Sequence, residues 1–168
     1  MKTAVAIGRA VAILASSRGP AAYASDDLSS ALIRDTLASR EVARRLAPTR
    51  SLGDLRAHLA PSSPQLSPLK VLPAPDRQRF LRSLKFNDKG LVEFEYSALA
   101  GLNADDVYRI LGLFGLQSGT GKMMGNGHVG AMDYWDSDGR QDDFLKDYRC
   151  QARATCSYSI SMACTANC

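Results

Sequence analysis

Apolar and polar residues alternate most clearly between residues 84 and 96. Leu84-Lys-Phe86 and Val92-Glu-Phe94-Glu-Tyr96 place an apolar side chain at every second position, which is the period of a strand with one buried face. The run Asn87-Asp-Lys-Gly90 between them consists of turn-forming residues. This stretch therefore predicts a β-hairpin.

A helical period follows the hairpin. Apolar side chains recur at i, i+3, i+4 and i+7, as on the buried face of a helix, at Val107, Ile110, Leu111 and Phe114. Asn103 is suited to cap the start of this helix and Gly115 to end it. We therefore expect a hairpin-helix unit over residues 77–115, and we place the conventional hydrophobic core of the chain there.

The chain between residues 25 and 76 predicts much less packing. Its first part combines an irregular apolar stripe with charged residues and predicts a helix that ends before Pro48. The arginines of this helix are diluted by acids, which favours a solvated face over a patch that binds nucleic acid or membrane. Five prolines from Pro61 to Pro75 then predict an extended linker.

The N-terminus has the features of a secretion signal. Lys2 precedes a mostly apolar stretch, and Ala22-Tyr-Ala24 has the small-x-small pattern of a signal-peptidase site. Residues 1–24 are therefore predicted to be a signal peptide, which makes the protein secreted. Arg9 interrupts the apolar stretch and no acid is present, so an organelle transit peptide and an ordinary cytosolic N-terminus remain alternatives.

All four cysteines lie within the last nineteen residues, at Cys150, Cys156, Cys164 and Cys168. A segment of this length cannot bury a core and normally needs cross-links to hold a shape. An even number of cysteines behind a secretion signal favours two disulfides. Residues 116–149, which are rich first in glycine and then in aspartate, form a spacer that a protease can reach. Residues 150–168 are then the mature peptide.

The middle of the chain contains two incomplete motifs. The run from Gly115 to Met123 is similar to a phosphate-binding loop, but Met123 replaces the required hydroxyl residue. Asp136-Ser-Asp138-Gly139 is similar to a calcium loop, but Leu145 occupies the position of its bidentate glutamate. The cysteine spacing is not a usual zinc pattern either. We therefore predict no catalytic residue, metal or cofactor, and a protein that is not an enzyme.

The cysteine-rich end has a strand pattern of its own. Residues 157–162 alternate hydroxyl and apolar side chains, which places Tyr158, Ile160 and Met162 on one face. An unbroken strand would hold Cys156 and Cys164 about 26 Å apart at roughly 3.3 Å per residue. It would therefore favour pairing Cys150 with Cys156 and Cys164 with Cys168, since disulfide Cα atoms lie within about 7 Å. A turn near Ser159 would instead favour the nested pairs Cys156–Cys164 and Cys150–Cys168.

The run Ser159-Ile-Ser-Met-Ala-Cys-Thr-Ala-Asn-Cys168 resembles the first two rings of nisin-type lantibiotics. In that family dehydrated Ser and Thr side chains are joined to cysteines by thioethers. The resemblance implies that Thr165 bonds Cys168 and that Ser159 or Ser161 bonds Cys164. The sequence departs from the family by the inserted Ala163 and by Ala166-Asn167 in place of Pro-Gly. The wider layout is similar to fulvocin C-related bacteriocin precursors.

Taken together, these patterns favour a secreted precursor of a small antimicrobial or toxin-like peptide. Its expected partners are a processing protease and an envelope component or receptor of a target cell, and not a nucleic acid. Tyr158, Ile160 and Met162 are the expected contact face. The alternatives are a secreted interaction protein with a disulfide-clamped tail and a lanthionine-containing peptide precursor.

Overall fold

The computed structural model describes residues 21–60, 67–124 and 143–168, with side chains described from residue 30 onward. The helices are α1 (Ala21–Arg45), α2 (Leu52–Leu59), α3 (Ala74–Ser83), α4 (Ala104–Gly112) and α5 (Thr120–Met124). Short 3-10 helices are η1 (Pro68–Val71), η2 (Ser97–Leu99) and η3 (Gln117–Gly119). The strands are β1 (Lys85–Asn87), β2 (Gly90–Glu95), β3 (Phe144–Ala152) and β4 (Thr155–Thr165). The predicted α+β fold class is confirmed.

The hairpin and the helix predicted from periodicity are both present. β1 and β2 pair antiparallel, and the Asn87 side chain accepts hydrogen bonds from the backbone of Lys89 and Gly90 within the turn. Asn103 caps α4 by accepting from the backbone N–H of Asp106 at 2.9 Å. Local sequence therefore determines both elements.

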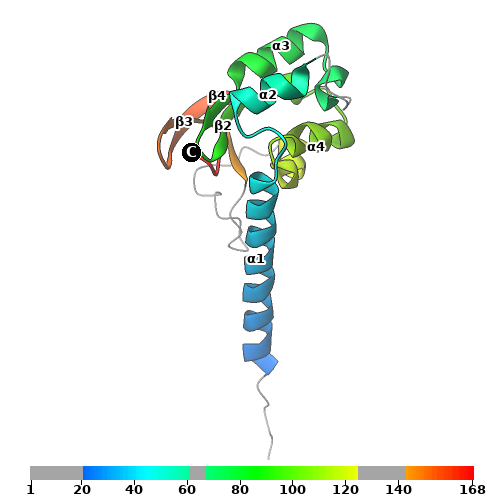
Figure 1. Cartoon of the computed structure of the whole chain (residues 1–168). Helices are drawn as coiled ribbons and strands as arrows, with labels where there is room; N and C mark the ends of the chain where they lie inside the picture. Colours follow the sequence, from blue (N-terminus) through cyan, green and yellow to red (C-terminus); the bar gives the residue numbers. More distant parts are fainter. Residues whose placement is uncertain (1–20, 61–66, 125–142) are drawn as a thin grey trace, which may run out of the picture.

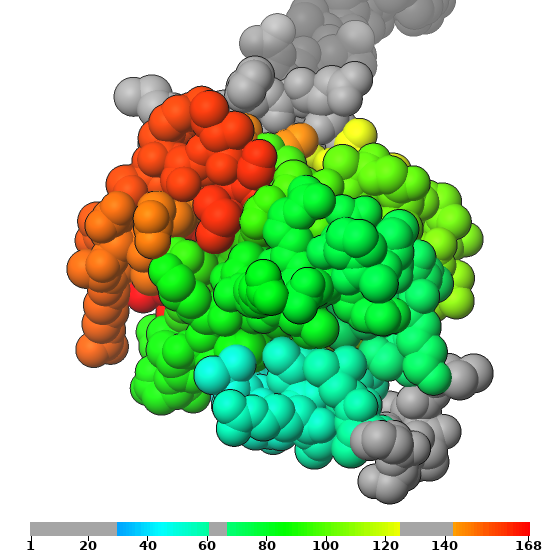
Figure 2. Space-filling model, turned by 90° about the horizontal axis from the view of Figure 1, so that it is seen from above, coloured from blue at the N-terminus to red at the C-terminus, as the bar shows by residue number. Residues whose placement is uncertain are grey.

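The four strands form one antiparallel sheet in the order β1-β2-β4-β3. β4, which contains two of the four cysteines, lies between β2 of the predicted hairpin and β3. Figure 2 shows this last part of the chain, in orange and red, packed directly against the green hairpin and helices. The predicted domain boundaries at residues 116 and 150 stay predictions, but the segments on either side of them share one sheet.

The predicted proline-rich linker is only partly extended. Residues 61–66 lie outside the described residues, whereas η1 begins at Pro68 and α3 has Pro75 in its first turn. Proline is tolerated there because the first N–H groups of a helix have no partner within the helix. The expectation of an extended linker is therefore wrong for residues 68–71 and 74–75, which are helical, whereas Leu72 and Pro73 between them are extended. Leu69 and Leu72 are buried in the core.

The core lies between the sheet and α3, α4 and the 3-10 helices, and its ring contacts join Phe80, Phe94, Phe114 and Phe144. Figure 1 shows α1 leaving this core as a long rod, so that it meets the rest of the protein near its C-terminal end. Leu32 and Val42 of its predicted apolar stripe are accordingly exposed. None of the helices in the described ranges is long and apolar enough to cross a membrane.

Candidate functional site

Two disulfides cross-link the end of the chain. Cys150 is bonded to Cys168 and Cys156 to Cys164, with Cα atoms 5.7 Å and 6.2 Å apart. The structure thus has the nested pairing, one of the two arrangements left open by the sequence. We call residues 143–168 the cysteine segment, and the described residues up to 124 the body.

The nested pairing depends on a bulge in β4. Tyr148 lies opposite Tyr158 and Lys146 lies opposite Ala163, so that Asp147 alone on β3 faces residues 159–162 on β4. The backbone of Ser161 has a φ of 66° and that of Asp147 a φ of 64°, a left-handed conformation that non-glycine residues rarely adopt. The β3 partners of Cys156 and Cys164 are still five residues apart, about 16 Å in a straight strand. The 6.2 Å spacing of the two cysteines therefore requires the ladder to bend at the bulge as well.

Contacts with the end of β2 hold this bulge. The carboxylate of Asp147 accepts hydrogen bonds from the Tyr96 hydroxyl at 2.6 Å and from the backbone N–H of Ser161 at 3.0 Å. The backbone N–H of Tyr96 donates to the Ser161 carbonyl at 2.9 Å. Burial, and then the bond to Asp147, raise the pKa of Tyr96 above its usual value of 10.0. Tyr96 therefore stays a neutral donor throughout the physiological range.

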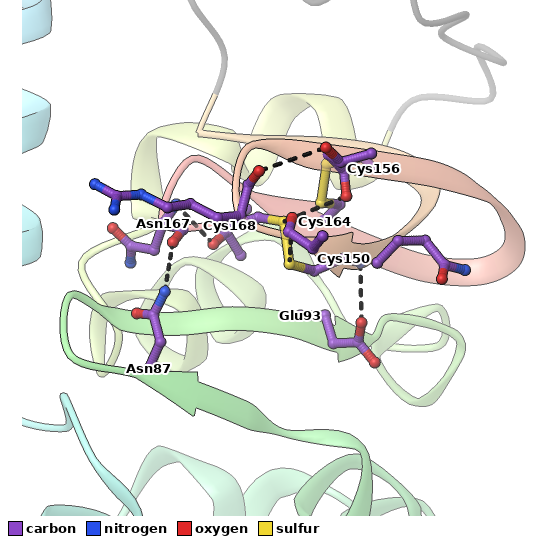
Figure 3. The surroundings of a disulfide bond; sticks show 12 residues. Asn87, Glu93, Cys150, Cys156, Cys164, Asn167 and Cys168 are labelled. Carbon is purple, nitrogen blue, oxygen red and sulfur yellow. Dashed lines mark hydrogen bonds between the residues drawn. A yellow bond between two sulfur atoms is a disulfide. The ribbon is translucent and has the colours of Figure 1, made fainter.

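The buried carboxylate of Glu93 on β2 binds groups on β1 and β3. Glu93 is 1% exposed, and its Oε2 accepts from the backbone N–H of Cys150 at 2.9 Å. Its Oε1 lies 2.6 Å from Nζ of Lys85. Figure 3 shows Glu93 pointing from β2 toward Cys150, beside the two disulfides. A buried carboxylate needs hydrogen-bond and ionic partners. Glu93 finds them in the Cys150 backbone and Lys85, and it thereby fixes the position of Cys150 against the sheet.

Hydrogen bonds also attach the final turn to the β1–β2 hairpin. The Asn87 side chain donates to the Asn167 carbonyl at 2.7 Å (Figure 3). The Thr165 hydroxyl and the Asn167 amide both donate to the Leu91 carbonyl, at 2.5 Å and 3.1 Å. The end of the cysteine segment is thus held by polar groups in addition to the β2–β4 ladder.

The start of the cysteine segment is held by an apolar and an ionic contact. Phe144 is fully buried, and its ring lies edge-on to that of Phe94 at 5.7 Å. The side chain of Asp143 is fully buried and accepts from Arg44 of α1 at 3.0 Å and from the Ser118 hydroxyl. We call the body residues that make the contacts described above the docking surface. They are Arg44, Asn87, Leu91, Glu93, Phe94, Tyr96 and Ser118.

The predicted contact residues differ in exposure. Tyr158 and Ile160 are 62% and 71% exposed, whereas Met162 is partly buried and lies opposite Glu95 in the β2–β4 ladder. The bulge is the reason, since it breaks the regular alternation on which the three-residue face was based. Tyr158 instead packs edge-on against Tyr148 of β3 at 6.1 Å.

The predicted thioether partners have other contacts in the structure. Each cysteine sulfur is joined to another cysteine, which leaves none for Ser159, Ser161 or Thr165. Ser161 lies in the bulge, and Thr165 is buried with its hydroxyl on Leu91. The structure therefore supports disulfide cross-links, and the thioether partners stay a prediction.

Of the two incomplete motifs, the structure describes the phosphate-loop-like run and leaves the calcium-like run outside the described residues. Gly119 of the phosphate-loop-like run lies so close to the Phe144 ring that a Cβ there would overlap it, so this run forms part of the docking surface. The calcium-like run Asp136-Ser-Asp138-Gly139 lies outside the described residues, as do residues 1–20 of the predicted signal peptide. Sγ atoms of Cys150, Cys164 and Cys168 lie within 4.8 Å of one another, but disulfide sulfurs do not offer the thiolates that metals bind.

Sequence reasoning missed the residues of the docking surface. The alternation around Glu93 predicts only a strand with one buried face, whereas β2 lies in the middle of the sheet and Glu93 itself is buried. Asp147 was counted only as one of the acids of the spacer. No local pattern marks either residue, since Cys150 and Tyr96, which they bind, are 57 and 51 residues away in sequence.

No protein-family model, curated protein or solved structure matches this chain.

Proposed function

We propose that the chain is a secreted precursor whose cysteine segment is a small antimicrobial or toxin-like peptide, covered by the body until a protease cuts between residues 125 and 142. The observation that carries this proposal is the placement of the cross-links. Both disulfides close within residues 150–168, so no covalent bond other than the backbone joins the segment to the body. One cut is therefore enough to make the segment separable.

The docked state hides part of the surface that a free peptide would present. Ala163, Cys164 and Thr165 of β4 are at most 2% exposed, and they lie against β2 and its neighbours. Removing the body would uncover this strand beside the exposed Tyr158 and Ile160. A peptide with such a surface suits a defined envelope component better than bulk membrane disruption. The three basic residues of the segment are opposed by Asp143 and Asp147, and each basic residue adds only about 1 kcal/mol of attraction to anionic lipid.

A second candidate is a secreted interaction protein in which the segment stays attached. The extent of the docking surface favours it, because Phe144 and Ala163 belong to the main core cluster. The precursor predicts a free, active cysteine segment in the medium, whereas the interaction protein predicts an uncut, active chain.

We expect mass analysis of the native host's culture medium to find a fragment that contains residues 150–168 and lacks the body. Its mass should rise by about 4 Da on reduction, because each of two disulfides takes up two hydrogens. Mass losses of about 18 Da that reductant does not change, one per dehydrated Ser or Thr, would indicate thioethers instead. Material that remains one uncut chain beginning near Ser25 would support the interaction protein.

Exposed apolar residues of the released peptide should decide its activity. We expect Ile160→Asp or Tyr158→Asp to abolish growth inhibition by the oxidised peptide, since either substitution would place an unpaired charge in the contact with the target. Arg153→Ala should retain most of the inhibition and is the matched control, because it is exposed and lies in the β3–β4 turn. Full inhibition by the Ile160→Asp peptide together with an inactive Arg153→Ala peptide would contradict this contact side.

A further inference from the structure

We propose that the body has a second function, independent of any later release: it is a folding template that selects the disulfide pairing of the cysteine segment. Docked on the body, the segment has the nested pairs Cys150–Cys168 and Cys156–Cys164. Without the docking contacts it adopts the short-loop pairs Cys150–Cys156 and Cys164–Cys168. The two arrangements contain the same number of disulfides, so they differ by exchange and not by oxidation.

The short-loop pairing is within reach of the folded backbone. Cys150 and Cys156 are directly opposite in the β3–β4 register, and opposite residues of antiparallel strands have Cα atoms about 4.5 to 5.5 Å apart. This spacing suits a disulfide. Cys164 and Cys168 are joined by a turn in which the N–H of Cys168 donates to the Thr165 carbonyl at 3.0 Å. Neither new bond requires a distant segment to move.

The sulfur atoms are also close enough to exchange. Sγ of Cys164 lies within 4.8 Å of Sγ of both Cys150 and Cys168. If a small thiolate attacks Cys156, it forms a mixed disulfide and releases the Cys164 thiolate. That thiolate attacks Cys168, forms Cys164–Cys168 and releases the Cys150 thiolate. The Cys150 thiolate then attacks Cys156 and expels the small thiolate, so that two disulfides remain and the thiol is only a catalyst.

The segment's own backbone opposes the nested pairing. It needs the bulge at residues 159–162, with Ser161 in the left-handed region, which is unfavourable for a residue other than glycine. In an unfolded chain the closure entropy also favours the shorter loops, and the nested bonds close loops of 8 and 18 residues. The nested pairing therefore needs stabilisation from elsewhere.

Contacts with the body supply this stabilisation. Tyr96 holds both sides of the bulge, through its hydroxyl on Asp147 and its backbone N–H on the Ser161 carbonyl. Glu95 of β2 pairs with Met162, the last residue of the bulge, and Phe94 pairs with Ala163 directly after it. These contacts fix the chain in the one shape that places Cys156 beside Cys164.

The test is to refold the reduced full chain in a buffer of reduced and oxidised small thiol, quench with acid, and map the disulfides by digestion and mass analysis. We expect the wild type to return the nested pairs. Tyr96→Phe should raise the Cys150–Cys156 pairing about tenfold or more, because it removes a hydrogen bond to a charged acceptor. Adding Ser161→Gly to Tyr96→Phe should lower it again, since glycine adopts a positive φ without steric cost. Tyr108→Phe is the matched control, because this tyrosine of α4 is 54% exposed.

A measurement on the wild type covers the case in which a variant fails to fold. Equilibrated with thiol in rising urea, the chain should exchange to the short-loop pairs over the same range in which circular dichroism shows the body unfolding. Nested pairs that persist beyond that range would overturn the proposal. So would a folded Tyr96→Phe chain with wild-type pairing, or a wild type that returns Cys150–Cys156. Absence of a released fragment from the culture medium would contradict only the precursor function.

Discussion

Phe144→Ala is expected to lower the free energy of unfolding of the whole chain by about 3 to 5 kcal/mol, the usual cost of removing a buried aromatic ring. The ring is fully buried against Phe94. On its other side the backbone at Gly119 is too close to admit even a Cβ. The cavity would lie between elements that are fixed by the sheet and by η3, so it can collapse only partly. Urea unfolding followed by far-ultraviolet circular dichroism measures the effect.

The matched control for this prediction is Ile160→Ala in the same segment. Ile160 is 71% exposed, and exposed substitutions usually change stability by less than about 0.5 kcal/mol. A single transition, shifted to lower urea by Phe144→Ala alone, would establish that the segment and the body unfold together. If both variants unfold like the wild type, the cysteine segment is not docked in solution and the docking surface is wrong.

The sequence predicts those elements of the fold whose information is local. The β1–β2 hairpin follows from alternation around Asn87-Asp-Lys-Gly90, and α4 follows from its cap at Asn103 and its apolar period. In both cases hydrogen bonds between near neighbours agree with the packing. Such agreement makes a prediction from one sequence reliable.

The cysteine segment shows where local information ends. Its alternating residues 157–162 predict an unbroken strand, and the nested disulfides require the strand to bulge. The contacts that decide between them come from Tyr96 on another strand. The pattern of residues 157–162 carries no information about Tyr96, so it cannot decide between the short-loop and the nested disulfide pairing. Packing between distant segments routinely overrides strand propensity in this way.

The glycines in the run from Gly115 to Met123, an incomplete phosphate-loop motif, have a structural use that the sequence does not indicate. Their spacing suggested a loop that approaches phosphate, while their structural use is close approach of the protein to itself. Gly119 approaches a ring of β3, and Gly115 approaches the backbone of α1. Both uses require the absence of a Cβ. Only the fold distinguishes a glycine that admits a ligand from one that admits a neighbouring segment.

Gly115→Ala is expected to destabilise the chain by about 2 to 5 kcal/mol, as the sum of two effects. Gly115 has a φ of 72°, and the left-handed region costs a residue with a Cβ roughly 1 to 2 kcal/mol. A Cβ there would also lie 2.5 Å from the Ala43 carbonyl oxygen and 2.6 Å from Cα of Arg44. Overpacking of this kind typically adds about 1 to 3 kcal/mol, and backbone cannot move aside as a flexible side chain can.

The same substitution at Gly112 is the matched control, because nothing lies within 4 Å of a Cβ there and the residue is the last of α4. Gly112→Ala should leave the urea midpoint unchanged or raise it slightly, since alanine is favoured over glycine in helices by up to about 1 kcal/mol.

The effect of Gly115→Ala should extend to the cysteine segment. The end of α1 that it displaces carries Arg44, which binds the buried carboxylate of Asp143 at 3.0 Å just before β3. Faster protease cleavage between residues 125 and 142 in the Gly115→Ala chain, but not in the Gly112→Ala chain, would show this coupling. Equal stability and equal cleavage in the two chains would contradict the close contact between α1 and the turn at Gly115 that follows α4.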